Sequence, residues 1–306
     1  MLNRIVLLSM CIIVLPGVAS PQVPATGCSA FQAYGPISLS AYAGWLDHPT
    51  GLTLTTRLTN FNQEFVDVTP LKGAWLEVAV ESFLPGRMGP GRVGFHVSGG
   101  MLVPSKLRGR EEETFSGAES HYAMSGISWG SLQGLMSYNL SEHFQLLGGF
   151  RWDHFNTRVD FSGSPAFLDF KLNSYVPLIG VKLDRRFFGG VLIAGLLGWP
   201  GAVPGHMTQS YVGGPQIGAW DHIEQDLARG YMVEFFSEYR RTLFGSAAAG
   251  VFVRWNNLHV ITGEDRYDWL ISGSAGTGGQ ATESFDRRSW TIGGSLTLDF
   301  ALPGFL

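Results

Sequence analysis

Eight charged residues occupy alternate positions of otherwise apolar segments, and they are the side chains of this sequence best placed to act together. They are Glu77, Glu81, Arg151, Asp153, Lys182, Glu234, Glu238 and Arg254. Alternate residues of a strand share one face, so all eight point inward if the strands enclose a lumen. Opposite charges there either pair across the lumen as a structural network or line a path for a small solute. We expect the pairing and keep the solute path as the second interpretation.

Other chemistry is hard to find in the sequence. It contains no phosphate-binding loop, no zinc-ligand spacing and no dinucleotide fingerprint. We therefore expect no metal and no cofactor.

The charged residues must be positioned by strands, because the apolar residues recur with a period of two. In the C-terminal segment Trp290, Ile292, Leu296, Leu298 and Phe300 alternate with small or polar residues. Alternating segments of about ten residues, bounded by turns, are typical of a transmembrane β-barrel. A soluble β-sandwich also alternates and is the competing architecture. The length of the segments favours the barrel, as does an expected interfacial belt of aromatic residues near their ends, namely Trp45, Trp75, Tyr138, Trp199, Tyr239 and Trp290.

The pattern predicts an all-β, antiparallel, up-and-down barrel of about ten strands, with twelve as the alternative. The expected strands are 36–46, 73–84, 92–103, 127–140, 143–159, 171–184, 187–199, 229–240, 243–262 and 289–300. Short connections alternate with long polar loops, as in outer-membrane barrels. The expected long loops are 47–72, 104–126, 160–170, 200–228 and 263–288.

Two features bear on the count of ten. The segment 52–58 also alternates, so the first loop either extends a strand above the membrane or adds one. Pro177 lies inside an expected strand, although proline removes a ladder hydrogen bond. If that strand is not part of the barrel, the count fails.

The composition fits a membrane barrel better than other classes. Only 15% of the 306 residues are charged, 13% are aromatic, and glycine occurs 41 times. The mean hydropathy is +0.10. Disorder requires the opposite balance. The net charge of −4 argues against a nucleic-acid partner.

The N-terminus resembles a secretory signal peptide. Arg4 precedes an apolar run from Ile5 to Leu15, and small residues follow. We expect residues 1–19 to be the signal, 20–34 a periplasmic segment and 35–306 the barrel. A later cleavage near Ala25, or a lipobox ending at Cys28, is the alternative. Loss of Cys11 with the signal would leave one thiol and no internal disulfide.

Two segments carry a resemblance to Gram-negative outer-membrane barrel proteins. They are the hairpin 132–153 and the terminal strand Leu296-Thr297-Leu298-Asp299-Phe300, which looks like the signal for the barrel-insertion machinery. The resemblance implies location in the outer membrane, with outer-membrane lipid, lipopolysaccharide and that machinery as partners. We expect a monomer.

Ten strands also resemble the omptin proteases, a family whose mechanism implies an aspartate pair and an Asp–His pair at the rim. Asp221 and His222 match the second pair, but the second loop carries Glu111, Glu112 and Glu113 instead of paired aspartates. His96 and Ser98 resemble the lipid A deacylases, in which a histidine activates a serine. Strand parity directs both of these side chains into the lumen, away from a lipid substrate.

These observations predict an integral outer-membrane barrel with a narrow charged lumen and acidic loops, each of the segments 200–229 and 263–288 having a net charge of −2. A structural or surface role and a small-solute channel remain open. A hydrolase active at the rim, omptin-like or deacylase-like, is the alternative. We favour the interpretation that the protein is not an enzyme.

Overall fold

The computed structural model describes residues 37–58, 63–84, 91–104, 107–113, 117, 119–163, 165–212, 219–263, 265–271 and 274–300. The expected signal peptide, the periplasmic segment and residues 301–306 lie outside these ranges. No helix in the described ranges is long and apolar enough to cross a membrane.

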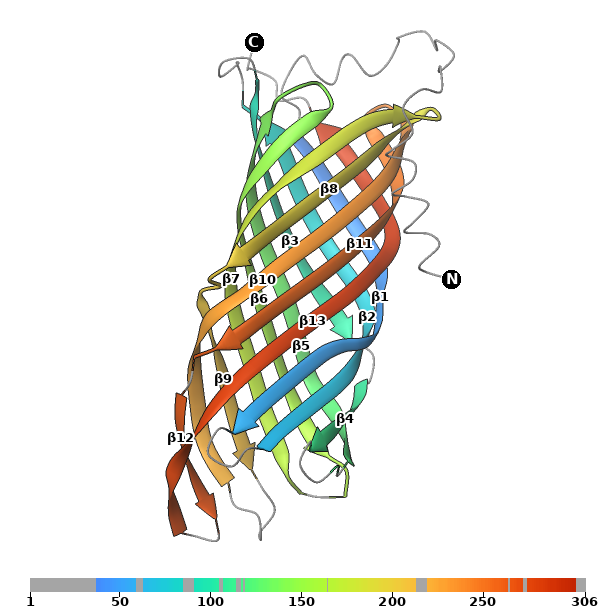
Figure 1. Cartoon of the computed structure of the whole chain (residues 1–306). Coiled ribbons are helices and arrows are strands. Elements are labelled where there is room, and N and C mark those ends of the chain that lie inside the picture. Colours follow the sequence, from blue (N-terminus) through green and yellow to red (C-terminus); the bar gives the residue numbers. More distant parts are fainter. Residues whose placement is uncertain are drawn as a thin grey trace.

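The chain folds into one antiparallel sheet of thirteen strands that closes on itself (Figure 1). The strands are β1 (Ile37–Leu58), β2 (Gln63–Phe83), β3 (Val93–Pro104), β4 (Leu107–Glu113), β5 (Glu119–Asn139), β6 (Phe144–Phe161), β7 (Phe167–Phe187), β8 (Gly190–Gly201), β9 (Gly205–Val212), β10 (Ala219–Phe244), β11 (Ala247–Thr262), β12 (Asp265–Ile271) and β13 (Ser274–Phe300). The ring runs β1-β13-β11-β10-β8-β7-β6-β5-β3-β2 and is closed by the pairing of β1 with β2.

The ring therefore contains ten strands, as the alternation predicted. The three remaining strands are β4, β9 and β12. Each one takes the place of a shorter ring strand in the half of the barrel opposite the short hairpins. β4 follows β3 between β2 and β5, β9 follows β8 between β7 and β10, and β12 follows β11 between β10 and β13. Closure matters because every backbone N–H and C=O must find a partner within the protein when the sheet crosses hydrocarbon.

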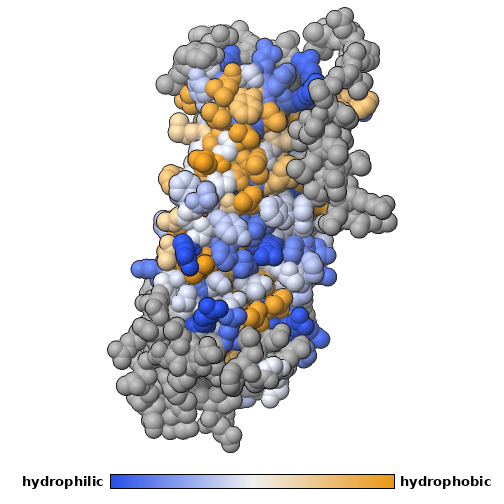
Figure 2. All heavy atoms as spheres, in the orientation of Figure 1, coloured by the Kyte–Doolittle hydropathy of each residue, from blue (hydrophilic) through white to orange (hydrophobic). Residues whose placement is uncertain are grey.

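Apolar residues gather on the outer surface towards the end of the barrel at which β1 begins and β13 ends, as one face shows in Figure 2. On β1 this apolar band runs from Leu39 to Trp45, and on β13 from Ile292 to Phe300; all four side chains are exposed. Exposed apolar side chains in a continuous band are favourable next to lipid and unfavourable next to water. The short hairpins lie at this end, which is the periplasmic end in outer-membrane barrels.

The expected long loops prove to be mostly strand, so those boundaries were wrong. β1 and β2 continue through most of 47–72, with a register shift between His48 and Leu52. β4, β5, β9, β10, β12 and β13 likewise extend through the other segments. The reason is that alternation persists beyond the membrane: Leu52 and Leu54 point inward and are buried. The segment 52–58 thus extends a strand and adds none.

Pro177 lies within β7 opposite Phe150 of β6, and the strand belongs to the barrel. Its position explains why proline is tolerated. On its other side β7 pairs with β9 up to Ser174 and with β8 from Ile179 onward. Pro177 therefore lies between the segment of β7 that pairs with β9 and the segment that pairs with β8. No backbone hydrogen bond to either strand is lost through its missing N–H.

Two expected members of the aromatic belt were misplaced, Trp75 and Trp199, and Trp199 packs against the buried apolar cluster inside the barrel. Trp45 is 55% exposed on the outer surface, but Trp75 is only 3% exposed and faces the lumen. It shares strand parity with Glu77 and donates a hydrogen bond from Nε1 to Glu77 Oε2 at 2.9 Å. Parity, and not closeness to a strand end, decides which face an aromatic residue occupies.

Gly149 gives a first testable prediction about barrel closure. A Cβ at this position would lie 2.0 Å from the carbonyl oxygen of Gly134 on the neighbouring strand, whereas a Cβ at Gly134 would meet nothing within 4 Å. We expect Gly149→Ala to lose most of the heat-modifiable folded form on gels after refolding, because backbone atoms must move apart. Gly134→Ala is the matched control and should fold normally. Equal yields for both variants would contradict this packing.

Candidate functional site: a lumen divided into polar and apolar layers

The structure places the eight sequence-predicted charged residues inside the barrel. Arg151 and Asp153 come from β6, Glu234 and Glu238 from β10, and the other four from β2, β7 and β11. The side chains of Arg151, Asp153 and Glu234 are 4%, 1% and 3% exposed. Charges this deeply buried require partners.

The partners come from other walls of the barrel. Arg151 Nη1 on β6 donates to Glu234 Oε2 on β10 at 2.6 Å. Lys182 Nζ on β7 donates to both carboxylate oxygens of Glu81 on β2, at 2.7 and 3.0 Å. Arg254 on β11 donates to both carboxylate oxygens of Glu77 on β2. These ion pairs cross the lumen and connect strands that are not neighbours in the sheet.

Three participants were not predicted from the sequence. Arg287 of β13 is fully buried and donates from Nη1 to Asp153 Oδ1 of β6 at 3.1 Å. Its guanidinium also lies over the ring of Trp129, 4.2 Å from the centroid. Arg240 pairs with Glu238 at 2.9 Å, and the Tyr42 hydroxyl donates to the same carboxylate at 3.3 Å. Strand parity would have revealed Arg287 if the last strand had been extended beyond Ser289.

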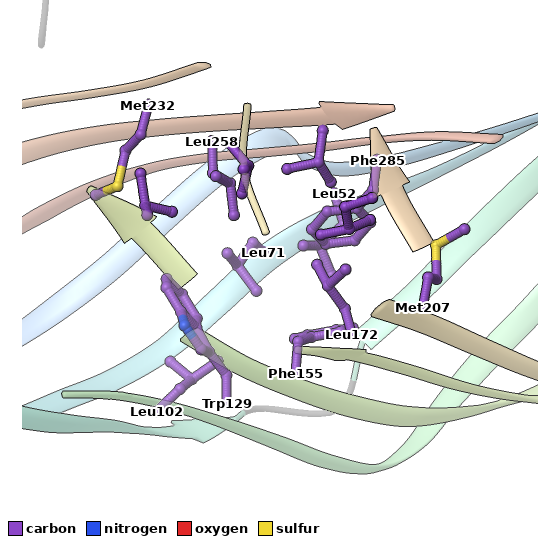
Figure 3. Close-up of a cluster of buried hydrophobic side chains, with 14 of the residues drawn as sticks. Leu52, Leu71, Leu102, Trp129, Phe155, Leu172, Met207, Met232, Leu258 and Phe285 are labelled. Atoms are coloured by element: carbon purple, nitrogen blue, oxygen red, sulfur yellow. The ribbon is translucent and has the colours of Figure 1, made fainter. Parts of the chain in front are cut away.

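Beyond the network, an apolar plug fills the lumen (Figure 3). Every strand of the ring contributes at least one side chain to the cluster, with Leu197 coming from β8. Ten of its members are labelled in the figure: Leu52, Leu71, Leu102, Trp129, Phe155, Leu172, Met207, Met232, Leu258 and Phe285. None of these ten is more than 3% exposed. They form one continuous cluster of buried residues.

The plug closes the barrel from wall to wall. β6 and β13 are five positions apart in either direction round the ring. Even so, the rings of Phe155 and Phe285 lie 5.7 Å apart between centroids, and those of Phe170 and Phe285 lie 5.5 Å apart. Aromatic rings at this separation are in packing contact. Opposite walls of the barrel are therefore in direct contact through these rings.

On the periplasmic side of the plug lies a polar cavity of about 80 Å³ within the barrel. Glu81 and Arg240 line its outer part, and Arg151 and Glu234 its inner part. His96 and Ser98 also line it, so this pair lies in the lumen and not on the lipid-facing surface. The arrangement does not offer the pair to a lipid substrate.

On the opposite side of the plug, Glu283 of β13 forms a second polar layer. It lies seven residues beyond Trp290, about 23 Å further along an extended strand, and so outside the apolar band. Gln209 Nε2 donates to Glu283 Oε2 at 2.6 Å, and Thr56 Oγ1 donates to Oε1 at 3.4 Å. No cation pairs with this carboxyl among the described residues, and burial raises its pKa to about 8.

Asp221 and His222 lie in β10, directly before Ile223, which pairs with the Gln209 of the second polar layer. Trp220 pairs with Tyr211 of β9, and Ile223 pairs with Gln209, so β10 has one residue more than β9 across this step. The pair therefore occupies a β-bulge, a feature that redirects side chains and is frequent beside active sites. The side chains of Asp221 and His222 lie outside the described residues.

Within the described part of the chain, no group of three or more histidine, cysteine and carboxylate residues could hold a metal ion.

Comparisons with known proteins agree with this architecture. No protein-family model matches the sequence, and no curated protein matches it. Among solved structures, the outer membrane protease OmpT from Escherichia coli is similar at a TM-score of 0.62 with 10% sequence identity, covering 87% of this chain and 97% of that one. The translocator domain of the autotransporter NalP from Neisseria meningitidis matches at a TM-score of 0.39 and 10% identity, covering 88% of each chain.

The OmpT likeness establishes the fold, and the sequence-based expectations of an antiparallel barrel and an outer-membrane location agree with it. The closed ten-strand ring and the lipid-facing band supply the physical reason for that agreement. The chain has the fold of a Gram-negative outer-membrane β-barrel.

Proposed function

We propose that this protein is a closed barrel that anchors a functional extracellular end in the outer membrane and does not act as a solute channel. The observation that carries the proposal is the apolar plug, to which every wall of the barrel contributes. An open pore needs a continuous hydrated path. Phe155 and Phe285 from opposite walls are in direct contact through their rings.

The charged network supports the same proposal. A conducting lumen presents charges to water, but here Arg151, Asp153 and Arg287 are nearly inaccessible and are paired with one another. Such ion pairs connect the strands on opposite sides of the barrel. Their charges neutralise each other, so they interact only weakly with an ion in the lumen. Beyond the plug, by contrast, the strands continue for many residues past the lipid-facing band.

Conductance of the refolded chain in planar bilayers tests the proposal. We expect no discrete current steps from protein that is β-rich and inserted, while an open porin in the same bilayers conducts. Reproducible steps whose size changes in Glu234→Gln would overturn the closed barrel and reinstate the solute channel.

A hydrolase active at the rim is the second candidate, and the β-bulge at Asp221–His222 is the observation that favours it. The bulge is followed directly by the pairing of Ile223 with Gln209, the residue that contacts the buried carboxyl of Glu283. The likeness to OmpT, which is described as an outer membrane protease, adds support at the level of the fold alone.

Peptide cleavage by refolded protein tests this candidate. A hydrolase of the omptin kind predicts cleavage of a mixed peptide library that falls at least about a hundredfold in Asp221→Asn. Asp226→Asn is the control, because Asp226 is exposed on the same strand. Absence of cleavage by the wild type, or equal loss in the two variants, counts against the hydrolase.

A further inference from the structure

The polar cavity on the periplasmic side of the plug is lined by two chemically different sets of side chains. The first set is charged, comes from β2, β7 and β10, and is internally neutralised, since Glu81 is paired with Lys182, and Glu238 with Arg240. The second set is neutral and comes from β3 and β5: Ser98, Ser131, Gln133 and Ser137. Among the described residues, none of these four side chains has a hydrogen-bond partner. All four residues line the cavity.

A second observation points to a missing partner. Gln145 is 5% exposed, lines the same cavity, and donates from Nε2 to Asp184 Oδ2 at 3.1 Å. Its Oε1 atom and Asp184 Oδ1 are buried without a hydrogen-bond partner in the described structure. Buried acceptors of this kind cost free energy unless a donor reaches them. The cavity thus offers neutral groups without hydrogen-bond partners, while the carboxylates that line it are ion-paired with Arg or Lys.

The size of the cavity limits what can occupy it. A cavity needs about 10–15 Å³ for each water-sized group. The cavity volume of about 80 Å³ therefore accommodates roughly five to eight such groups. That is the size of a short polyol, and too small for a hexose.

Exposure along the network shows from which side the cavity is reached. The side chains of Glu81 and Arg240, near the hairpin end, are 27% and 21% exposed, but those of Arg151 and Arg287, next to the plug, are 4% and 0% exposed. Of these four side chains, the two near the periplasmic hairpins are the most exposed, so we place the entrance of the cavity at that end.

We propose that this cavity is a binding site, entered from the periplasm, for a small uncharged polyhydroxylated solute. Hydroxyl groups of the solute would exchange hydrogen bonds with Ser98, Ser131, Gln133 and Ser137. The site rests on the cavity alone and does not depend on what the extracellular end does.

Saturation-transfer NMR on the refolded full chain in detergent tests the site, with erythritol as the probe. We expect transfer from protein to erythritol, weaker transfer to the larger mannitol, and a loss of about fivefold or more in Gln133→Leu. Ser98→Ala provides a milder variant if Gln133→Leu folds poorly. Heat-modifiable gel mobility reports folding in each case.

Ser40→Ala is the matched control. Ser40 is equally buried in the lumen but pairs with Thr297 Oγ1 at 2.9 Å and does not line the cavity. It should bind erythritol like the wild type. A cavity that holds water only, seen as no transfer to erythritol from folded wild type, overturns the proposal. Equal transfer to mannitol and erythritol, or equal loss in Ser40→Ala, does so as well.

Discussion

Asp153→Asn is expected to destabilise the barrel by about 3–5 kcal/mol, the usual cost of leaving a buried charge without its partner. Asp153 accepts hydrogen bonds from Arg151 at 2.9 Å and from Arg287 at 3.1 Å. The amide keeps the shape of the side chain but removes its charge, so Arg287 loses its paired carboxylate and Arg151 keeps only Glu234, at 2.6 Å. Chemical unfolding in detergent, followed by tryptophan fluorescence, measures the effect, and Trp129 beside Arg287 is a local reporter.

Asp169→Asn is the matched control for this experiment. Asp169 also pairs with an arginine, Arg158, at 2.8 Å, but the two side chains are 45% and 46% exposed. Exposed pairs contribute little to stability because water and salt screen them. We expect a much smaller loss than for Asp153→Asn. Similar losses for the two variants would mean that the lumen is hydrated and the central pairs are screened.

Glu283→Gln should change how stability depends on pH. The pKa of the Glu283 carboxyl rises on folding from 4.5 to about 8, because the group is buried without a cation among the described residues. The folded state therefore binds a proton more tightly than the unfolded state does. The stabilisation is complete below the unfolded pKa and is lost as pH rises through the folded pKa. At about 1.4 kcal/mol per unit, the wild type loses several kcal/mol between about pH 5 and about pH 9.

Glu283→Gln keeps a neutral group beside Gln209 and Thr56 and should lose much less stability over the same range. Glu64→Gln is the control, since Glu64 lies on the outer surface and pairs with Arg57 at 2.7 Å; it should follow the wild-type profile. Unfolding midpoints measured across this range decide the matter. A wild-type profile as flat as that of Glu283→Gln would show that the carboxyl is ionised in the folded barrel.

The ring of ten strands was predictable because lipid and a packed lumen both impose the period of two. Trp290 to Phe300 show the pattern most clearly, and the inward position of Glu77, Arg151 and Glu234 follows from strand parity alone. Strand ends were harder. Leu52 and Leu54 continue the pattern past a register shift at His48, and polar residues on the outer face there resemble a loop because that face meets water.

The partners inside the lumen were not predictable. Which cation meets which carboxylate depends on register and tilt round the whole ring, which is why Arg287 of β13 reaches Asp153 of β6 on the opposite wall. The plug was also missed, because Leu71, Leu172 and Leu258 are separated by about a hundred residues along the chain and come together only when the barrel closes. The bulge at Asp221 and His222 follows from pairing with β9, a strand that the sequence reads as loop.

Sided chemical labelling tests the closed lumen most directly. The variant Ser98→Cys, in a background with Cys11 and Cys28 replaced by serine, is reconstituted in vesicles with one orientation. A small, charged, membrane-impermeant thiol reagent is then added from one face at a time. The plug predicts no labelling of position 98 from the extracellular face, with labelling confined to the periplasmic face. Labelling from the extracellular face at a comparable rate would show an open path through the barrel and would contradict the account.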